Sequence, residues 1–373
     1  METAGETGKR VATRLRLNVT QTLSDRQTTQ ERPPAHLMIG NVRIPGRVLI
    51  APMTGVSDLP YRRAASRLGA AYVATEMVAC DAFARGRPDV VRRAAVGDGL
   101  PLMVIQLVGR DVRLIAQSAA MAEAAGAHII DLNMGCPAKE VTGALSGSAL
   151  MRDLDLAESL ITAAIGATSR PVTLKMRLGW DCASMNAPEL ATRAERAGVK
   201  AITVHGRTRQ QFYRGHADWR AVAAVKAAVR VPVIINGDIV DAGTARLALA
   251  ESGADAVMIG RGSCGRPWIA STIDSALQTQ LPSCEPGHME RLPIVLEHFE
   301  DSLRFYGAAL GLRVFRKHLG WYVESSAWIS ATARRAARSH LCKLERPQEV
   351  MDGLEAFWAG AELQKSSAAT LTI

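Results

Sequence analysis

The sequence predicts an α/β fold, a (β/α)8 TIM barrel followed by a C-terminal all-helical domain. Eight short apolar runs rich in Val, Ile, Ala and Met alternate with amphipathic segments of helical length. Apolar strands separated by helices are typical of a parallel sheet buried on both faces, and eight of them match the strand count of a TIM barrel. Beyond Glu290 the strand-like runs stop and helical patterns follow. A doubly wound open sheet is the alternative architecture for the first part.

The chain begins with a segment that carries no apolar periodicity. Residues 1–35 mix Thr, Gln, Arg and Glu, a composition that predicts a disordered N-terminal extension. His36–Pro45 then places two short apolar runs around Gly40 and Asn41, which is the pattern of a small β-hairpin. We therefore predict a barrel domain over residues 36–285.

The predicted strands are uninterrupted apolar runs. They are Val48–Ala51, Tyr72–Thr75, Leu102–Leu107, Ile129–Leu132, Val172–Met176, Ala201–Val204, Val233–Ile235 and Ala256–Ile259. The segments between them have helical periodicity, and several end at Gly, as helix C-termini often do. The clearest are Val112–Gly126, Leu154–Gly166, Pro188–Gly198, Ala217–Val229 and Ala242–Gly253.

The C-terminal part reads as helices alone. Pro282 to Pro293 marks the end of the barrel pattern, and three helical segments follow, Leu292–Leu310, Leu312–Glu324 and Ser326–Leu344. We therefore predict a helical domain over residues 290–365.

The net charge points to a polyanionic partner. The 373 residues include 45 Lys and Arg against 36 Asp and Glu, which gives a formal charge of +9 and a pI of about 9.5. Between Leu312 and Arg346 there are eight basic residues and two glutamates. Most of the excess positive charge thus lies in the helical part, where it favours binding to nucleic acid.

Other features of the sequence exclude classes of protein. No apolar stretch has the roughly 18 residues of a membrane span, and the polar segment after Met1 lacks a signal-peptide core, so we expect a cytoplasmic protein without membrane contact. The six cysteines are scattered without a C-x-x-C pair, and Cys264, Cys284 and His288 lack zinc-site spacing. The sequence therefore predicts reduced thiols and no structural metal.

Polar residues follow each apolar run, at the end of the barrel where active sites lie. The residues in these positions are Pro52, Met53, Thr54, Glu76, Gln106, Asn133, Cys136, Lys175, Arg177, His205, Arg207, Asn236, Gly237, Asp238, Gly260, Arg261 and Gly262. This ring combines amide, ammonium, imidazole and thiol groups with Gly-rich loops after the last two strands. Such a set favours a bound ligand over isolated structural polar residues.

The loop after the last strand is suited to a phosphate group. Backbone N–H groups of a Gly-rich loop bind anions, and barrels often bind phosphate after strands seven and eight. Gly260–Gly265 also matches G-x-G-x-x-G, but a dinucleotide-binding unit requires a further strand ending in an acidic residue, and Leu281–Pro286 supplies none. Turn glycines without a ligand are the alternative interpretation.

Three residues of the ring carry specific chemistry. Lys175 ends an apolar run, where a buried ammonium group requires an anionic or carbonyl partner such as the N1–C2=O edge of a flavin. Gln106 is placed to hydrogen-bond a pyrimidine-like ring edge. Cys136, with an ordinary thiol pKa near 8.5, is protonated at neutral pH and suited to donate a proton. Structural roles for each, and a nucleophilic Cys136 with His205 as base, remain alternatives.

An ordered set of motifs resembles the tRNA-dihydrouridine synthases over residues 36–345. The motifs are Ala51–Asp58, Glu76–Met77, Gln106–Gly109, Asp131–Lys139, Val172–Trp180, Thr203–Arg207, Asn236–Ile239 and Gly260–Gly262. In the helical part, Arg316–Tyr322 is similar to the bacterial B-type branch of this family. The order of the motifs along the chain makes the resemblance more specific than any one of them.

The resemblance implies an FMN enzyme that uses NADPH, or alternatively NADH, to reduce selected uridines of tRNA to 5,6-dihydrouridine. It implies hydride addition at C6 and protonation of C5 by Cys136 as general acid. A D-loop uridine is implied, with U17 favoured. It makes residues 36–285 the FMN-binding catalytic domain and residues 290–365 the tRNA-binding domain. We expect a monomer.

The resemblance and the charge pattern together assign roles to residues. FMN is expected to contact Pro52, Met53, Thr54, Gln106, Lys175, His205, Asn236, Gly237, Asp238, Gly260 and Arg261. Substrate contacts are expected from Arg177, which we assign to the uracil carbonyls, and from Lys139, Arg316, Lys317, Arg334, Arg335 and Arg338. The target base has to leave the tRNA stack to react, which requires binding to RNA away from the reacting atom.

Two other functions are compatible with the sequence. A small-molecule FMN barrel reductase of the dihydroorotate or pyrimidine type would share the flavin site and the cysteine without needing basic helices. A non-catalytic RNA-binding protein on a degenerate barrel would bind no flavin.

Overall fold

The computed structural model describes residues 36–95, 97, 100–143, 145–282 and 284–370. The predicted disordered extension, residues 1–35, lies outside these described residues. The part of the chain from Ala35 onward forms one compact unit.

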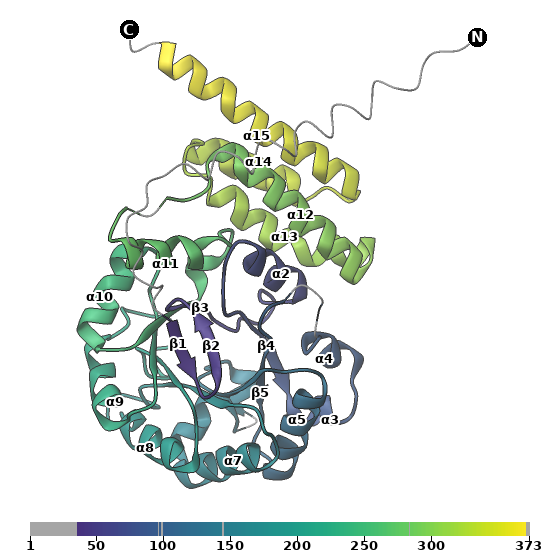
Figure 1. The fold of residues 1–373 in the computed structure, drawn as a ribbon. Coiled ribbons are helices and arrows are strands. Elements are labelled where there is room, and N and C mark those ends of the chain that lie inside the picture. Colours follow the sequence, from purple (N-terminus) through teal and green to yellow (C-terminus); the bar gives the residue numbers. More distant parts are fainter. Residues whose placement is uncertain (1–35, 96, 98–99, 144, 283, 371–373) are drawn as a thin grey trace. The chain divides into compact units, whose positions relative to one another are not determined.

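In the described part of the chain, eight parallel strands form one sheet that curls into a barrel (Figure 1). They are β3 (Val48–Ile50), β4 (Ala74–Ala79), β5 (Val104–Val108), β6 (Ile129–Met134), β7 (Val172–Arg177), β8 (Ile202–His205), β9 (Val233–Asn236) and β10 (Ala256–Ile259). The hydrogen-bonded order runs from β3 through β10 and back to β4. Ile50 bridges Val73 in parallel, and its N–H donates to the Tyr72 carbonyl at 2.9 Å, so the first and last strands of this order also meet. The TIM barrel prediction is confirmed.

Helices surround the barrel and are capped as their sequences indicate. They are α2 (Leu59–Arg67), α3 (Cys80–Ala84), α4 (Pro88–Arg93), α5 (Val112–Ala124), α6 (Lys139–Gly143), α7 (Leu154–Gly166), α8 (Ala187–Ala197), α9 (Ala223–Ala228), α10 (Ala242–Ser252) and α11 (Ile269–Thr279). The Asp111 and Asp153 side chains accept N–H groups at the starts of α5 and α7. Gly198 and Gly253 end α8 and α10 in the left-handed region.

One barrel helix differs from its predicted range. The segment predicted over Ala217–Val229 contains a short 3-10 turn, Arg220–Val222, followed by α9. Its first residues are bound elsewhere, since the Ala217 N–H donates to the Asp238 carboxylate at 2.8 Å and the Asp218 N–H donates to the Gly206 carbonyl at 2.6 Å. These bonds hold residues 217 and 218 outside the helix.

The predicted hairpin is confirmed and fills one end of the barrel. Strands β1 (His36–Ile39) and β2 (Val42–Pro45) pair antiparallel, and Figure 1 shows them across the centre of the ring of strands. Leu37, Ile39 and Ile44 are buried with the inward-facing apolar side chains of the barrel strands. The turn at Gly40 lies against Pro171 and Lys200, which precede β7 and β8. The hairpin therefore covers the N-terminal end of the strands and leaves the C-terminal end as the mouth.

The C-terminal part is helical, as predicted. Its first helix begins earlier than the sequence indicates, and the last of its four described helices was not among the predicted segments. The helices are α12 (His288–Tyr306), α13 (Ala308–Glu324), α14 (Ala331–Leu341) and α15 (Pro347–Thr370). Helix α12 continues through Pro293, which the sequence placed at a boundary. It begins earlier because the Glu290 carboxylate accepts the Gly287 N–H at 2.6 Å and caps the helix.

The C-terminal helices share buried contacts with the barrel. Trp268, at the start of α11, belongs to the same apolar core as Phe299, Phe315 and Trp358. The Tyr306 hydroxyl donates to the Asp58 carboxylate at 3.0 Å. Arg63 of α2 pairs with Asp301 of α12 at 3.1 Å. These contacts fasten α12 to the first barrel helix.

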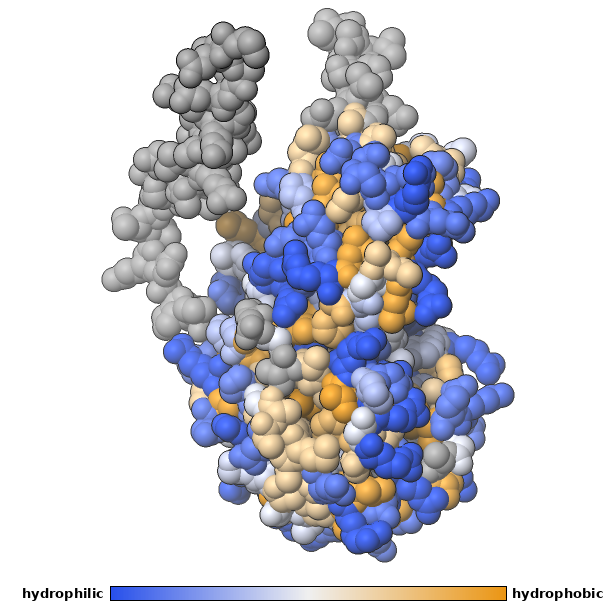
Figure 2. All heavy atoms as spheres, turned by 90° about the vertical axis from the view of Figure 1, so that its right-hand side faces the viewer, coloured by the Kyte–Doolittle hydropathy of each residue, from blue (hydrophilic) through white to orange (hydrophobic). Residues whose placement is uncertain are grey.

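The outer surface carries mixed polar and apolar side chains. Hydrophilic residues cover much of the face seen in Figure 2, over the C-terminal helices and the barrel alike. Among the described residues, no helix combines the length and apolarity that would let it cross a membrane.

Candidate active site at the mouth of the barrel

A cavity of about 350 Å³ opens at the C-terminal ends of the strands. Nine of the eleven residues predicted to contact a cofactor line it, namely Pro52, Met53, Lys175, His205, Asn236, Gly237, Asp238, Gly260 and Arg261. The strand register brings them together, because Arg177 of β7 pairs with His205 of β8, which pairs with Asn236 of β9. The cavity falls within the size range of small-ligand and cofactor sites.

Lys175 projects a half-buried ammonium group toward the cavity. Its Nζ donates to the Asn236 side-chain oxygen at 3.0 Å, and the Asn236 amide nitrogen donates to the Met258 carbonyl at 2.7 Å. Burial, together with repulsion from Arg177, lowers the pKa of Lys175 to about 8, although Asp131 opposes the change. The ammonium group is therefore charged at neutral pH and close to the point where it would lose its proton.

His205 lies among cations and is held neutral. Burial lowers its pKa well below the ordinary value, and the positive charges of Lys175, Arg177, Arg207 and Arg261 act in the same direction. Arg207 Nη1 lies 3.3 Å from His205 Nε2. A neutral imidazole offers a hydrogen-bond donor or acceptor to a ligand without adding charge.

Asp238 organises the basic side of the cavity. Its carboxylate accepts a bond from buried Arg207 at 2.6 Å and lies 3.6 Å from Arg261. Hydrogen bonds from Arg207 and from the Ala217 N–H outweigh burial and lower its pKa below the ordinary range. The Arg261 side chain is exposed, and its guanidinium carbon lies 5.0 Å from the Tyr213 ring centroid. Arg261 is therefore held at the rim with a donor face available.

The turn after β9 comes unusually close to the cavity wall. Gly237 has φ +119°, and a Cβ built there would lie 2.8 Å from Ala217 Cβ and 3.1 Å from the His205 ring. Only glycine fits this backbone conformation and this space without strain. The Gly237 backbone lines the cavity and can thus approach a ligand directly.

Gln106 lies in a buried network beneath the cavity and does not line it. Its Nε2 donates to Asp131 at 2.6 Å, and its Oε1 accepts from Asn133 at 2.7 Å. Asp131 also accepts the Thr173 hydroxyl at 2.6 Å, and burial raises its pKa. Both ends of the Gln106 amide are thus occupied in this network.

The same network positions the cysteine loop. The Asn133 side-chain oxygen accepts the N–H groups of Gly135 at 3.1 Å and Cys136 at 2.9 Å. Ser148 binds the Cys136 carbonyl through its N–H and its hydroxyl. Cys136 is therefore fixed at the end of β6 by bonds on both sides of its peptide unit.

The Cys136 thiol is half-buried and protonated at neutral pH. Burial raises its pKa above the ordinary value, although nearby Arg177 and Lys175 favour the thiolate. This is the state of a proton donor and not of an activated nucleophile. Cys136 itself is not among the described residues that line the cavity of Lys175 and His205.

Arg177 is buried and binds backbone carbonyls. Its Nε donates to the Gly135 carbonyl at 2.8 Å, and its Nη1 donates to the carbonyls of Thr208 and Phe212 at 2.8 and 2.9 Å. Burial lowers its pKa to about 10. Arg177 thus joins the cysteine loop to the loop after β8.

The other predicted residues lie outside the cavity. Thr54 is exposed after β3, and Lys139 is exposed at the start of α6. Arg316 donates to the Leu344 carbonyl, while half-buried Lys317 approaches Gly55 and lines a smaller cavity with Glu76. On α14, Arg338 pairs with Glu324 and Arg334 donates to the Glu324 carbonyl at 2.6 Å, whereas Arg335 is exposed without an ion pair among the described residues.

Two polar residues at the site, Asp131 and Tyr213, were absent from the predicted set. Asp131 lies within an apolar strand run, and its carboxylate was identifiable as a buried charge that needs partners. Tyr213 reaches the cavity from the long loop after β8. No pattern in the sequence indicates the direction of a side chain in an irregular loop.

Comparison with known proteins identifies the family. The model of the dihydrouridine synthase (Dus) family matches residues 49–360. The chain belongs to the dihydrouridine synthase family. A protein named probable tRNA-dihydrouridine synthase, from Rhodobacter capsulatus, is 53% identical over 293 residues, which are 78% of this chain and 90% of the relative. The tRNA-dihydrouridine synthase B of Pseudomonas putida is 43% identical over 290 residues, 77% of this chain and 85% of that protein.

A solved structure of a different enzyme shares the fold. The 6-hydroxypseudooxynicotine amine oxidase from Pseudomonas geniculata superposes with a TM-score of 0.52 at 12% identity, covering 68% of this chain and 50% of that one. At this identity the likeness shows the fold alone. The family assignment rests on the sequence relatives and on the family model, whose match over residues 49–360 includes both the barrel and the C-terminal helices.

Proposed function

We propose that this chain reduces a D-loop uridine of tRNA, with U17 favoured, to 5,6-dihydrouridine, using FMN and NADPH. The observation that carries the proposal is the family match over residues 49–360, which includes the barrel mouth with Cys136 and Lys175 and the basic helices. Relatives that this chain matches over about nine-tenths of their length are named probable tRNA-dihydrouridine synthases. We further propose that it acts as a cytoplasmic monomer.

The cavity at the barrel mouth fits FMN. It is lined by a Lys ammonium group, a neutral imidazole, an Asn amide and an exposed arginine, beside a glycine turn that has no room for a Cβ. We assign the ring system to Pro52, Met53, Lys175 and His205, and the phosphate to Asn236–Asp238 and Gly260–Arg261. Gln106 and Thr54 are assigned as indirect or peripheral contacts. When bound, reduced FMN supplies the hydride that adds to C6 of uracil.

Cys136 supplies the proton that completes the reduction. Addition at C6 places negative charge on C5 and O4, and transfer of the thiol proton to C5 removes that charge. The raised pKa of Cys136 keeps the proton available at neutral pH, and the thiolate left behind is stabilised by Arg177 and Lys175 until it recovers a proton from solvent. Arg177 holds the cysteine loop through Gly135, and we assign it to substrate positioning on that ground.

The C-terminal helices are the proposed tRNA-binding surface. Residues 290–365 would form the tRNA-binding domain and residues 36–285 the catalytic domain. The positive charge comes from exposed Arg335 and from Arg334, Arg338, Arg316 and Lys317, which also contact other groups of the protein. Lys139 adds one positive charge at the mouth of the barrel. Phosphate contacts of this kind give an affinity that depends on salt.

The proposal is tested on the full-length protein with unmodified tRNA, FMN and either NADPH or NADH. We expect dihydrouridine in digested tRNA by mass spectrometry, at one D-loop position. Cys136→Ala should still bind FMN and still oxidise NADPH, but form product at least about 100-fold more slowly, the range for loss of a general acid. Cys182→Ala, which removes an exposed cysteine, is the matched control and should behave as wild type.

Other outcomes favour the other functions. Turnover of free uracil-type or dihydroorotate-type substrates without modification of tRNA would identify a small-molecule oxidoreductase. Protein that stays colourless after incubation with FMN but binds tRNA would be a non-catalytic RNA-binding protein. Product formation by Cys136→Ala at the wild-type rate would remove the general-acid role.

A further inference from the structure

We propose that Asp58, His298 and His318 bind a divalent transition-metal ion, with Zn²⁺ the best chemical match, where helix α2 meets α12 and α13. The three residues are buried, and their ligand atoms all lie within 4.8 Å of one another. They do not line the cavity at the barrel mouth. The site is therefore separate from the proposed chemistry and does not depend on it.

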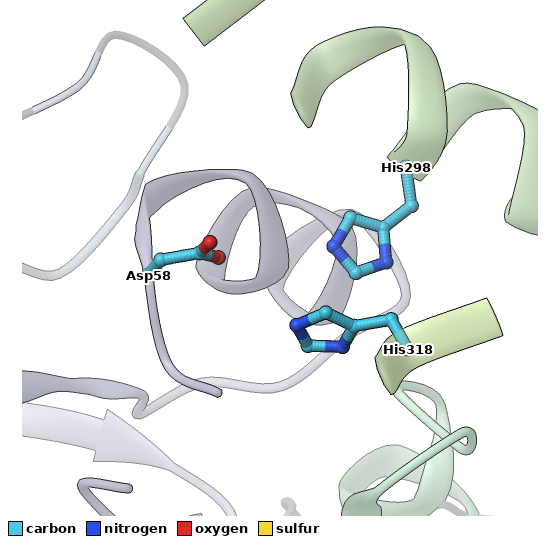
Figure 3. A group of neighbouring side chains, drawn as sticks. All are labelled: Asp58, His298 and His318. Atoms are coloured by element: carbon cyan, nitrogen blue, oxygen red, sulfur yellow. The ribbon is translucent and has the colours of Figure 1, made fainter. Parts of the chain in front are cut away.

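The two imidazole groups present unused nitrogen atoms to the same space. Figure 3 shows the rings of His298 and His318, from two different helices, turned toward the side on which Asp58 lies. Nε2 of His298 and Nε2 of His318 are both buried and have no hydrogen-bond partner among the described residues. Buried polar atoms of this kind normally have a partner, and two in one cluster point to a missing ligand.

The surroundings hold both rings in place, and they orient His298 as an outer-shell group does in a metal site. His298 Nδ1 lies 2.9 Å from the Tyr322 hydroxyl, which fixes the ring and leaves Nε2 to face the cluster. The His318 ring stacks on Tyr61 with centroids 5.7 Å apart. A hydrogen bond at one ring nitrogen with the other nitrogen free for the ion is the usual arrangement of a metal-binding histidine.

Asp58 supplies the negative charge and retains free lone pairs. One carboxylate oxygen accepts the Tyr61 N–H at 3.0 Å, and the other accepts the Tyr306 hydroxyl at 3.0 Å. Each carboxylate oxygen can accept a second interaction. Two neutral imidazoles and one carboxylate form a nitrogen and oxygen set that suits Zn²⁺.

Binding requires only small side-chain movements. Zinc ligands at about 2.0–2.2 Å from the ion lie roughly 3.3 Å apart in a tetrahedron, so the three atoms have to converge by about an ångström. Asp58 also lines a cavity of about 190 Å³ together with Glu76, Asp89, Lys317 and Tyr306, which gives an ion a route in and leaves space for a water as fourth ligand. Lys317 adds a positive charge on that route, and Glu76 and Asp89 offset it.

An ion at this position would cross-link the barrel and the C-terminal helices. Asp58 caps α2, while His298 in α12 and His318 in α13 lie 240 and 260 residues further along the chain. The sequence predicts no structural metal, because the Cys and His spacings typical of zinc sites apply to ligands that lie close together in the chain. Here the fold brings distant residues together.

The test measures metal content and heat stability of the full-length protein. After purification with Zn²⁺ and extensive dialysis, elemental analysis should find about one zinc per chain in the wild type and little in His318→Gln or His298→Gln. His340→Gln, on the exposed face of α14, is the matched control and should keep the metal. Removal of zinc from the wild type with a chelator should lower Tm, and added Zn²⁺ should restore it, which supplies a readout if a variant fails to fold.

Failure of the wild-type protein to bind a metal ion would overturn the proposal. Wild-type protein that holds well under about 0.2 zinc per chain after exposure to excess Zn²⁺, Co²⁺ or Ni²⁺, with an unchanged Tm, would make the cluster a purely hydrogen-bonded and stacked contact. Zinc retained equally by His298→Gln, His318→Gln and the wild type would place the ion elsewhere. Visible absorption of the Co²⁺ form provides an independent check on imidazole ligation.

Discussion

At the scale of single residues, the barrel mouth is dominated by charges whose partners lie in the protein. Two cations, Lys175 and Arg261, face one cavity beside the neutral His205, and only Asp238 among its described lining residues is acidic. The imbalance favours an anionic or electron-rich ligand. It also makes the protonation state of Lys175 a property that experiments can follow.

Lys175 predicts a pH dependence for FMN binding. Because burial lowers its pKa to about 8, the ammonium group is charged at pH 7 and largely neutral at pH 9. The FMN affinity of the apoprotein, measured by quenching of flavin fluorescence, should therefore fall as pH rises through about 8. Losing the charge in one hydrogen bond costs about 1 kcal/mol, or roughly fivefold in Kd.

Two variants separate this effect from general pH sensitivity. Lys175→Gln should bind FMN more weakly at pH 7 and show a flat profile between pH 7 and 9. Lys226→Gln, which removes an outer-barrel lysine paired with Asp255, should keep the wild-type profile. A wild-type profile in Lys175→Gln would exclude contact between this ammonium group and the flavin.

The residues of the site could be predicted where they follow strands. Lys175, His205 and Asn236 directly end apolar runs, so the barrel geometry brings them together without further information. The partners of Arg177 could not be predicted, because they are backbone carbonyls of two irregular loops. A contact of Arg177 with the substrate stays a prediction beside these observed bonds.

At the scale of elements, the turn after β9 depends on a single glycine. Gly237→Ala would place a Cβ 2.8 Å from Ala217 Cβ at φ +119°. We expect a loss of about 1–3 kcal/mol in the free energy of unfolding by urea, together with weaker FMN binding. Gly166→Ala, at the end of α7 with no atom within 4 Å of the added Cβ, should leave both unchanged or slightly improve stability. Equal stability of the two variants would contradict the strain argument.

Helix α14 contains one arginine that is free to meet RNA. Arg335 is exposed without an ion pair among the described residues, whereas Arg338 is already paired with Glu324. Arg335→Glu should weaken tRNA binding and reduce the slope of log K against log salt by about 1 or more. Arg230→Glu, an exposed arginine at the closed end of the barrel, is the control for net charge. Equal loss in both variants would indicate a non-specific effect.

Elements were predictable in proportion to the regularity of their apolar pattern. The strands and the helices α5, α7, α8 and α10 follow simple periodicities. Helix α2 does not, because it buries Arg62, whose guanidinium donates to the Ala95 carbonyl at 2.8 Å and to Met103 Sδ at 3.2 Å. A buried arginine with tertiary partners is indistinguishable from a surface arginine in the sequence.

At the scale of the whole molecule, the barrel and the C-terminal helices should unfold together. Trp268 is buried in the helical core although it begins a barrel helix. Trp268→Ala should cost about 3–5 kcal/mol and shift one calorimetric transition to lower temperature. Two transitions, of which only one moves, would instead indicate that the helices and the barrel are independently stable.

The hairpin at the closed end of the barrel has a kinetic consequence. Leu37, Ile39 and Ile44 fill that end, so within the described residues the cavity opens at the mouth alone. In the proposed reaction NADPH and tRNA would use this one entrance, and the oxidised nicotinamide would have to leave before the target base enters. Initial rates at several tRNA concentrations should give parallel lines in double-reciprocal plots, and intersecting lines would require both substrates to be bound at once.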